Sequence, residues 1–271
     1  MTAENAETKV ADTAVVAGTV VATPRVFTYW EGPKSPLINL CLQSIVKNIP
    51  GIEVWTLAQF EAAYAADPSN KLGPWEQIAA KKPNTQSDLL RYWLLSTYGG
   101  IWVDADFIAF RDIRPVWDAT ADYIGYRIGF RTSKNAMPFT AIMGASPASP
   151  VVAAQVATAA TFMSGTRKMR NKNSLGPRLT REVLKAQPNT KAVWIERKLI
   201  HPIRWFKFKG KPLGNDAFPF DPNAYGLMLV HRVVARFRKH TEEELLRDQT
   251  VIGQAFRKAL AIPNDTQPAT A

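Results

Sequence analysis

The stretch SDLLRYWLLSTYGGIWVDAD, residues 87–106, contains the features that decide the fold of this chain. Its first twelve residues have the apolar spacing of an amphipathic helix, in which Ser87 is suited to cap the N-terminus and Asp88 to the positive end of the dipole. Two glycines then end the helix and let the chain turn sharply. The apolar run that follows predicts a buried strand leading into Asp104 and Asp106.

The chain before this stretch alternates between strand-like and helix-like segments. Residues 25–30 (RVFTYW) and 52–57 (IEVWTL) are rich in β-branched and aromatic residues and predict strands. Residues 37–48 and 58–66 have helical spacing. A strand–helix–strand–helix order is typical of a parallel sheet with right-handed crossovers, so the sequence predicts an α/β fold.

The chain after residue 106 continues with both kinds of segment, and a C-terminal helix is predicted from the capping-box pair Thr241 and Glu244 to about Leu260. Further strands are expected at residues 107–110, 123–130 and 192–195, and further helices at 75–82, 151–163 and 177–185.

We expect one domain over residues 24–262, with a disordered leader at 1–23 and a flexible tail at 263–271. No segment has the roughly 20 consecutive apolar residues of a membrane span, and the N-terminus lacks the basic cluster of a signal peptide. The single cysteine, Cys41, excludes an internal disulfide and a zinc site built on paired cysteines. It favours a reducing, cytoplasmic location.

The composition limits the classes of protein without choosing among them. Of 271 residues, 46% are apolar, which excludes wholesale disorder. The chain has 34 Lys and Arg against 23 Asp and Glu, a formal net charge of +11. That excess is compatible with a nucleic acid, an anionic membrane surface or an anionic small molecule as partner.

Asp104 and Asp106 form an acidic pair at the end of the predicted strand. In an extended chain, residues two apart point to the same face, and two carboxylates there repel each other unless a cation lies between them. Mg²⁺ and Mn²⁺ prefer such oxygen ligands, and α/β proteins bind ligands at the carboxyl ends of parallel strands. The tripeptide D-x-D alone is also compatible with a solvated loop.

Residues 87–106 resemble the sugar-donor signature of the DXD-motif glycosyltransferases, S-D-x-x-R followed by a helix and G-G-x-x-x-D-x-D. That family includes capsular polysaccharide synthesis proteins and α-mannosyl- and galactosyltransferases, and more distantly the glucosylating clostridial toxins. Weaker similarities at 29–33 (YWEGP), 175–180 (LGPRLT) and 224–231 extend the resemblance over about 25–237. It implies a GT-A type fold, with a Rossmann-like, mostly parallel central sheet flanked by helices.

The resemblance also implies roles for individual residues. Asp104 and Asp106 would hold Mn²⁺ or Mg²⁺ and, through it, the diphosphate of a nucleotide sugar, and His231 could complete the metal shell. Asp88 would accept hydrogen bonds from sugar hydroxyls, and Arg91 would donate to the sugar or to phosphate.

Tyr29 and Trp30 are the candidates for nucleotide binding, with Trp30 placed to stack on the base. Structural alternatives remain open for these residues. Trp30 could be a core aromatic, the pair Asp88 and Arg91 could be a surface ion pair, and His231 could be structural. Family members often have a tryptophan soon after this histidine, which this chain lacks.

The implied reaction is metal-dependent, retaining transfer of a hexosyl group from a UDP-hexose or GDP-mannose to an acceptor hydroxyl, in polysaccharide or glycolipid synthesis. The acceptor would be a glycan or a lipid-linked sugar. No catalytic base or nucleophile is assigned, because the acceptor can attack on the leaving-group face while the diphosphate takes the proton.

Two alternatives are a basic nucleic-acid-binding protein and a non-catalytic sugar-nucleotide binder. The basic segments 167–172 and 206–211 could contact phosphates, with Phe206 and Phe208 stacking on bases. The positive charge is scattered and no helix-turn-helix or RNP-like motif is present, so nucleic acid is not expected. We assign the basic excess after residue 165 to the acceptor side: an anionic glycan, a lipid-phosphate carrier, or a peripheral contact with an anionic membrane.

Overall fold

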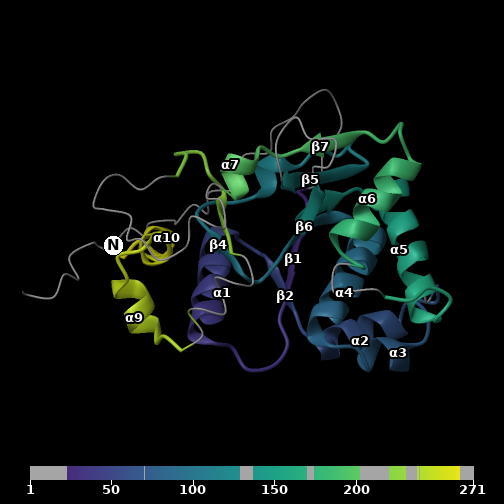
Figure 1. Ribbon diagram of the computed structural model, residues 1–271, viewed down its shortest axis with the longest axis horizontal. Helices are drawn as coiled ribbons and strands as arrows, with labels where there is room; N and C mark the ends of the chain where they lie inside the picture. Colours follow the sequence, from purple (N-terminus) through teal and green to yellow (C-terminus); the bar gives the residue numbers. More distant parts are fainter. Residues whose placement is uncertain are drawn as a thin grey trace, which may run out of the picture.

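Six strands form the central sheet, in the order β2-β1-β3-β6-β5-β7 (Figure 1). The structure is a computed structural model that describes residues 23–69, 71–128, 137–169, 174–201, 220–229, 237 and 239–262. The strands are β1 (Val26–Tyr29), β2 (Glu53–Trp55), β3 (Gly100–Val103), β5 (Tyr123–Ile128), β6 (Met137–Ala145) and β7 (Ala192–Trp194).

The described strands of this sheet run mostly in one direction. β1 pairs in parallel with β2 and β3, and β5 pairs in parallel with β7. β6 is antiparallel to both β3 and β5, so it runs against the other five. The expected mostly parallel α/β sheet is therefore confirmed, whereas β6, which joins its two halves, was not predicted.

Helices cover both faces of the sheet, because side chains along each strand alternate between two clusters. Phe27 and Trp102 pack in a cluster with α2 to α6, whereas Val26, Ile101 and Val103 pack in another with the end of α1. The helices are α1 (Pro36–Asn48), α2 (Leu57–Ala65), α3 (Trp75–Ala79), α4 (Pro83–Tyr98), α5 (Pro150–Met163) and α6 (Pro177–Ala186).

Helix α4 begins one turn earlier than the sequence pattern indicated. Pro83 is its first residue, where a fixed φ and a missing N–H suit a helix start. Lys82 precedes it in an extended conformation, and no side chain caps the helix. The predictions that Ser87 caps this helix and that Asp88 lies in its first turn are therefore wrong. The predicted end is confirmed, because Gly99 terminates the helix with φ of 63°.

A second, two-stranded sheet pairs β4 (Phe107–Ala109) with β8 (Gly226–Met228) in antiparallel fashion. It lies between the central sheet and a third apolar cluster, which joins α1 to α9 and α10 (Figure 1). The remaining elements are a 3-10 turn η1 (Arg114–Val116), α7 (Arg197–Ile200), α9 (Glu242–Arg247) and α10 (Val251–Leu260).

The C-terminal region contains two helices where the sequence predicted one. The capping box at Thr241 and Glu244 is confirmed, with both reciprocal hydrogen bonds present. Helix α9 then ends at Arg247, because Asp248 leaves the helical conformation and its carboxylate accepts the N–H of Thr250. The prediction of a continuous helix is therefore wrong.

Several predictions fall on parts of the chain that the structure does not describe. These are the leader at 1–23 except for residue 23, the tail at 263–271, the basic segment 206–211 and residues 170–172 of the other basic segment. Within the described ranges, no helix is both long enough and apolar enough to cross a membrane.

Candidate functional site

Asp104 and Asp106 lie in a tight turn that connects β3 to β4. The N–H of Phe107 donates to the carbonyl of Asp104 at 3.2 Å, which closes the turn. The N–H of Asp104 donates to the carbonyl of Ala141 at 2.8 Å, and the carbonyl of Asp106 accepts from Leu229 at 3.1 Å. The assumed extended geometry of this pair is therefore wrong, but backbone bonds fix the turn from both sides.

Arg91 connects this turn to the middle of α4. Its Nη2 donates to Oδ1 of Asp104 at 2.8 Å, and its Nη1 lies 3.3 Å from Oδ1 of Asp88. The indole N–H of Trp102 donates to the same Asp104 oxygen at 2.6 Å. Arg91 is only 3% exposed, so its pair with Asp88 is a buried network rather than the surface ion pair considered above.

The electrostatics of this group are unbalanced, because one guanidinium faces three carboxyl groups. Burial raises the pKa of Asp88 to about 6, against the opposing charge of Arg91. Burial and the negative charge of Asp104 raise the pKa of Asp106 to about 8. A raised carboxyl pKa means that the surroundings do not compensate the negative charge. A further cation beside Asp104 and Asp106 would stabilise the ionised carboxylates and so lower these raised pKa values.

One cavity of about 650 Å³ brings the predicted residues together. Six of the seven predicted site residues line it, from three separate segments: Tyr29, Trp30, Asp88, Arg91, Asp104 and Asp106. The seventh, His231, lies outside the described residues.

The two aromatic residues at the end of β1 differ in what they can offer a ligand. Tyr29 is 5% exposed, and its hydroxyl donates to Oε1 of Gln86 at 3.1 Å. Trp30 is half-buried and packs against the cluster around α1, while its indole N–H donates to the carbonyl of Gly32 at 3.0 Å. Trp30 is thus both a partial core residue and a wall of the cavity.

Other cavity residues were missed from the sequence. Glu31 fixes one wall, because its Oε2 accepts the N–H of Leu57 at the start of α2 at 2.9 Å. Asn84 and Ser87 line the cavity from the first turns of α4. Asn84 could have been found only with the correct helix start, whereas Glu31 lies inside the YWEGP segment already noted.

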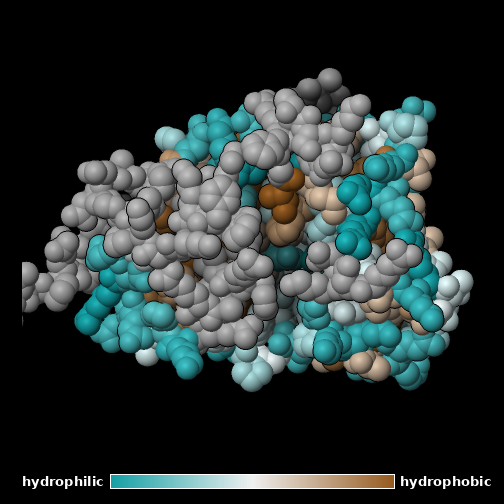
Figure 2. Space-filling model, in the orientation of Figure 1, coloured by the Kyte–Doolittle hydropathy of each residue, from teal (hydrophilic) through white to brown (hydrophobic). Residues whose placement is uncertain are grey.

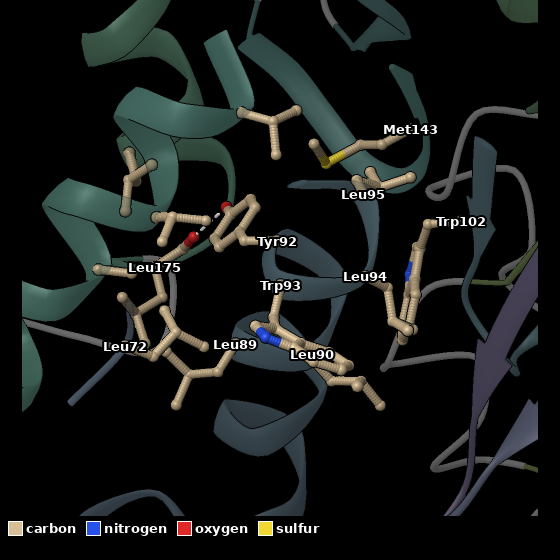
Figure 3. Packing of buried hydrophobic residues seen from close by; sticks show 14 of the residues in the cluster. Leu72, Leu89, Leu90, Tyr92, Trp93, Leu94, Leu95, Trp102, Met143 and Leu175 are labelled. Atoms are coloured by element: carbon tan, nitrogen blue, oxygen red, sulfur yellow. Dashed lines mark hydrogen bonds between the residues drawn. The ribbon is translucent and has the colours of Figure 1, made fainter. Parts of the chain in front are cut away.

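The start of α6 stands beside the same site. A side-chain carbon added at Gly176 would lie 3.8 Å from Oδ1 of Asp88. The preceding residue, Leu175, is tied to α4, because the hydroxyl of Tyr92 donates to its carbonyl (Figure 3). The LGPRLT segment therefore approaches the acidic group, as a functional role for it would require.

The residues present fit a divalent cation, although they supply only part of a ligand set. Asp104 and Asp106 offer carboxylate oxygens of the kind that Mg²⁺ and Mn²⁺ prefer, and the raised pKa of Asp106 marks uncompensated charge. Within the described ranges, no group of three or more His, Cys, Asp and Glu side chains is placed to hold a metal. Further ligands would have to come from a bound diphosphate or water.

A mostly parallel α/β sheet with an acidic turn after a central strand agrees with the fold that the resemblance to glycosyltransferases implied. The chain belongs to the capsular polysaccharide synthesis protein family, whose sequence model matches residues 16–167. That match contains the six cavity residues named above and begins inside the expected leader. The similarities noted at 175–180 and 224–231 lie beyond it.

A solved structure described as "PaToxG Glycosyltransferase" is similar to this chain, at 16% sequence identity. The similarity covers 60% of this chain and 69% of that one, with a TM-score of 0.43. No curated protein matches the chain.

Proposed function

We propose that this protein is a metal-dependent, retaining hexosyltransferase that uses a nucleoside diphosphate sugar. The observation that carries the proposal is that the end of β1, the middle of α4 and the β3–β4 turn all line one cavity, of about 650 Å³. Its size falls within the roughly 300–1,000 Å³ of small-molecule sites. Family membership supports the transfer of a sugar in polysaccharide synthesis.

Each wall of the cavity has a distinct task in this proposal. Trp30 stacks on the nucleobase at the end of β1, and Tyr29 supports that wall through its bond to Gln86. Asp88 accepts hydrogen bonds from hydroxyls of the hexose. Arg91 holds Asp88 and Asp104 in place through its two terminal nitrogens, and it lines the cavity, where it would donate to the sugar or phosphate.

Asp104 and Asp106 are the residues that would hold Mn²⁺ or Mg²⁺. When bound, such a cation would neutralise charge that develops on the departing diphosphate. Asp104 already shares one oxygen with Arg91 and Trp102, whereas burial and the charge of Asp104 raise the pKa of Asp106 to about 8, so that its ionised form would be stabilised by a cation. We therefore expect metal binding to depend more strongly on Asp106 than on Asp104.

The proposed reaction breaks the bond between the anomeric carbon and the diphosphate and forms one to an acceptor oxygen on the same face. The acceptor proton passes to the departing diphosphate oxygen, so a protein base is not needed. The role of the chain is to orient the sugar, through Asp88 and Arg91, and to exclude water. The donors we expect are UDP-hexoses or GDP-mannose, and the acceptor a glycan or a lipid-linked sugar.

The test measures thermal shifts and slow hydrolysis with a panel of UDP- and GDP-sugars, with and without Mn²⁺. A bound donor should stabilise the native state by mass action, and the largest shift should require the metal. Asp106→Asn should abolish the metal-dependent shift and lower hydrolysis at least about a hundredfold. Glu61→Gln removes one exposed carboxylate from α2, away from the cavity, and should leave both unchanged. Near-normal turnover by Asp106→Asn would refute the metal role.

A further inference from the structure

A second cavity, of about 580 Å³, lies between the end of α5 and the exposed face of α6 and is lined mainly by cations. Five Arg and Lys side chains line it, Arg167, Lys168, Arg178, Arg181 and Lys185, against the single carboxylate Glu182. This gives the cavity wall a formal charge of 5 − 1, or +4. Figure 2 shows hydrophilic side chains gathered over this part of the molecule.

Glu182, the one acidic residue that lines this cavity, already forms an ion pair with Arg167. Both carboxylate oxygens of Glu182 accept from Arg167, at 2.7 and 2.5 Å. That hydrogen bonding lowers the pKa of Glu182, so the pair is charged at neutral pH. Within the described part of the chain, the other four cations have no carboxylate within ion-pair distance. Four positive charges therefore face the hollow without a carboxylate partner among the described residues.

Three of these cations form a row along α6. Arg178, Arg181 and Lys185 are three and four residues apart, so they share one face of the helix. The opposite face buries Leu179 and Val183 against the core. Lys185 is seven positions after Arg178 on the helix, so the row spans roughly 10 Å. That length matches several successive charged units of an extended ligand better than one compact anion.

The row begins two residues after Gly176, which approaches the candidate active site. Gly176, next to Asp88, precedes Arg178 by only two residues. A chain bound along α6 would have one end beside the residue that we assign to the donor sugar. An acceptor must lie with one hydroxyl at that sugar and its body elsewhere, and the cation-lined cavity along α6 could hold that body.

We propose that the α6 groove, formed by Lys168, Arg178, Arg181 and Lys185, binds an acceptor glycan that carries repeated anionic groups. This rests on the proposed function, because it places the acceptor of that transfer. The charges line a hollow rather than a protruding surface, which favours a discrete chain over a membrane. Phe162 is 6% exposed, with the Arg167 guanidinium 4.8 Å above its ring, and so is covered against stacking on a nucleic-acid base.

The test measures direct binding to the full chain, without donor, by titration calorimetry. The probes are an oligogalacturonate with one carboxylate per sugar, a polyphosphate of similar length, and a neutral malto-oligosaccharide. We expect the anionic probes to bind with steep salt dependence and the neutral one not to bind. The preferred anion identifies carboxylate or phosphate as the recognised group.

The decisive variant is the triple change Arg178→Gln, Arg181→Gln and Lys185→Gln, which should weaken binding of the anionic probe roughly tenfold or more. The matched control, Lys81→Gln, Lys239→Gln and Arg247→Gln, removes the same charge outside both cavities and should change binding less than about twofold. Equal weakening in both variants, or equal binding of the neutral probe, overturns the proposal. Anionic vesicles and poly(U) serve as two further probes. If either binds through this face while the anionic glycan does not, the proposal is also overturned.

Measuring donor hydrolysis distinguishes failure of this proposal from failure of the proposed function. The triple variant should hydrolyse the nucleotide sugar at the normal rate, because the changed side chains lie outside the donor cavity. If the wild-type chain binds the anionic glycan but never hydrolyses a nucleotide sugar, the proposed function fails while the groove stands. If hydrolysis is normal and glycan binding is absent, the groove proposal alone fails.

Discussion

Arg91 Nη2 lies 2.8 Å from Asp104 Oδ1 and thereby joins the middle of α4 to the end of β3. The two residues are thirteen apart in sequence, and the intervening glycine turn brings helix and strand together. The same guanidinium also engages Asp88, so one side chain sets the relative positions of the metal-binding and sugar-binding carboxylates of the proposed mechanism.

Arg91→Lys is therefore expected to damage both stability and donor binding. A lysine keeps the charge but lacks the fork that reaches Asp88 and Asp104 together, which leaves one partly buried carboxylate without its ion pair. We expect a loss of about 2 kcal/mol or more in the free energy of unfolding. Urea titration measures it, with Arg247→Lys as control, since the exposed pair of Arg247 and Glu243 is worth at most about 1 kcal/mol. Equal losses in the two variants would contradict a special role for Arg91.

The glycine pair after α4 is required by backbone geometry. Gly100 has φ of 104°, and an added Cβ would lie 2.4 Å from the carbonyl oxygen of Arg25, the residue before β1. Gly100→Ala should therefore cost at least about 3 kcal/mol, since β1 and β3 would have to separate. Gly165→Ala is the matched control: its φ is 76° but no atom lies within 4 Å, so strain alone should cost about 1–2 kcal/mol. Comparison of the two denaturation midpoints separates the loss of stability due to the steric clash with Arg25 from the loss due to a positive φ alone.

Asn48 fastens the last turn of α1 to two distant elements. The two N–H groups of its side-chain amide are shared among three carbonyls, those of Ser44, Ala109 and Ala259, which lie 3.0, 3.0 and 2.9 Å from Nδ2. Asn48→Ala leaves carbonyls of β4 and α10 without this partner and should cost about 2–4 kcal/mol. Thermal unfolding tests this, and Asn189→Ala, at an exposed turn, should cost less than about 0.5 kcal/mol. A small effect at Asn48 would mean that water replaces the amide.

Elements defined by local sequence patterns were predicted correctly, whereas those that depend on long-range contacts were missed. The segments that became β1, α1, β2 and α2 were predicted because their apolar periodicity is local. β6 was missed because its residues, MPFTAIMGA, include a proline and show no clear alternation, and its place between β3 and β5 depends on long-range pairing.

The candidate site shows the same division. The spacing of Asp88 and Arg91 on one helix face follows from sequence, but the bond from Arg91 to Asp104 is a tertiary contact. The resemblance to a family, not periodicity, grouped β1, α4 and the acidic turn into one site. Glu31 and Asn84 had no separate signal, since their roles depend on how the cavity closes around them.

His201 should make the stability of the fold depend on pH in a defined window. Burial, at 3% exposure, lowers its pKa to about 4, and the charge of Arg197 acts in the same direction, against a hydrogen bond to the Met228 backbone. The unfolded chain, with a histidine pKa near 6.5, binds more protons between pH 6.5 and 4, so stability falls as the pH decreases through that range. The expected loss between pH 7 and pH 5 is about 2 kcal/mol. His201→Gln should lack this component, and urea unfolding of both proteins at the two pH values measures it. If wild type and variant lose stability equally, the histidine is not titrating as its burial requires.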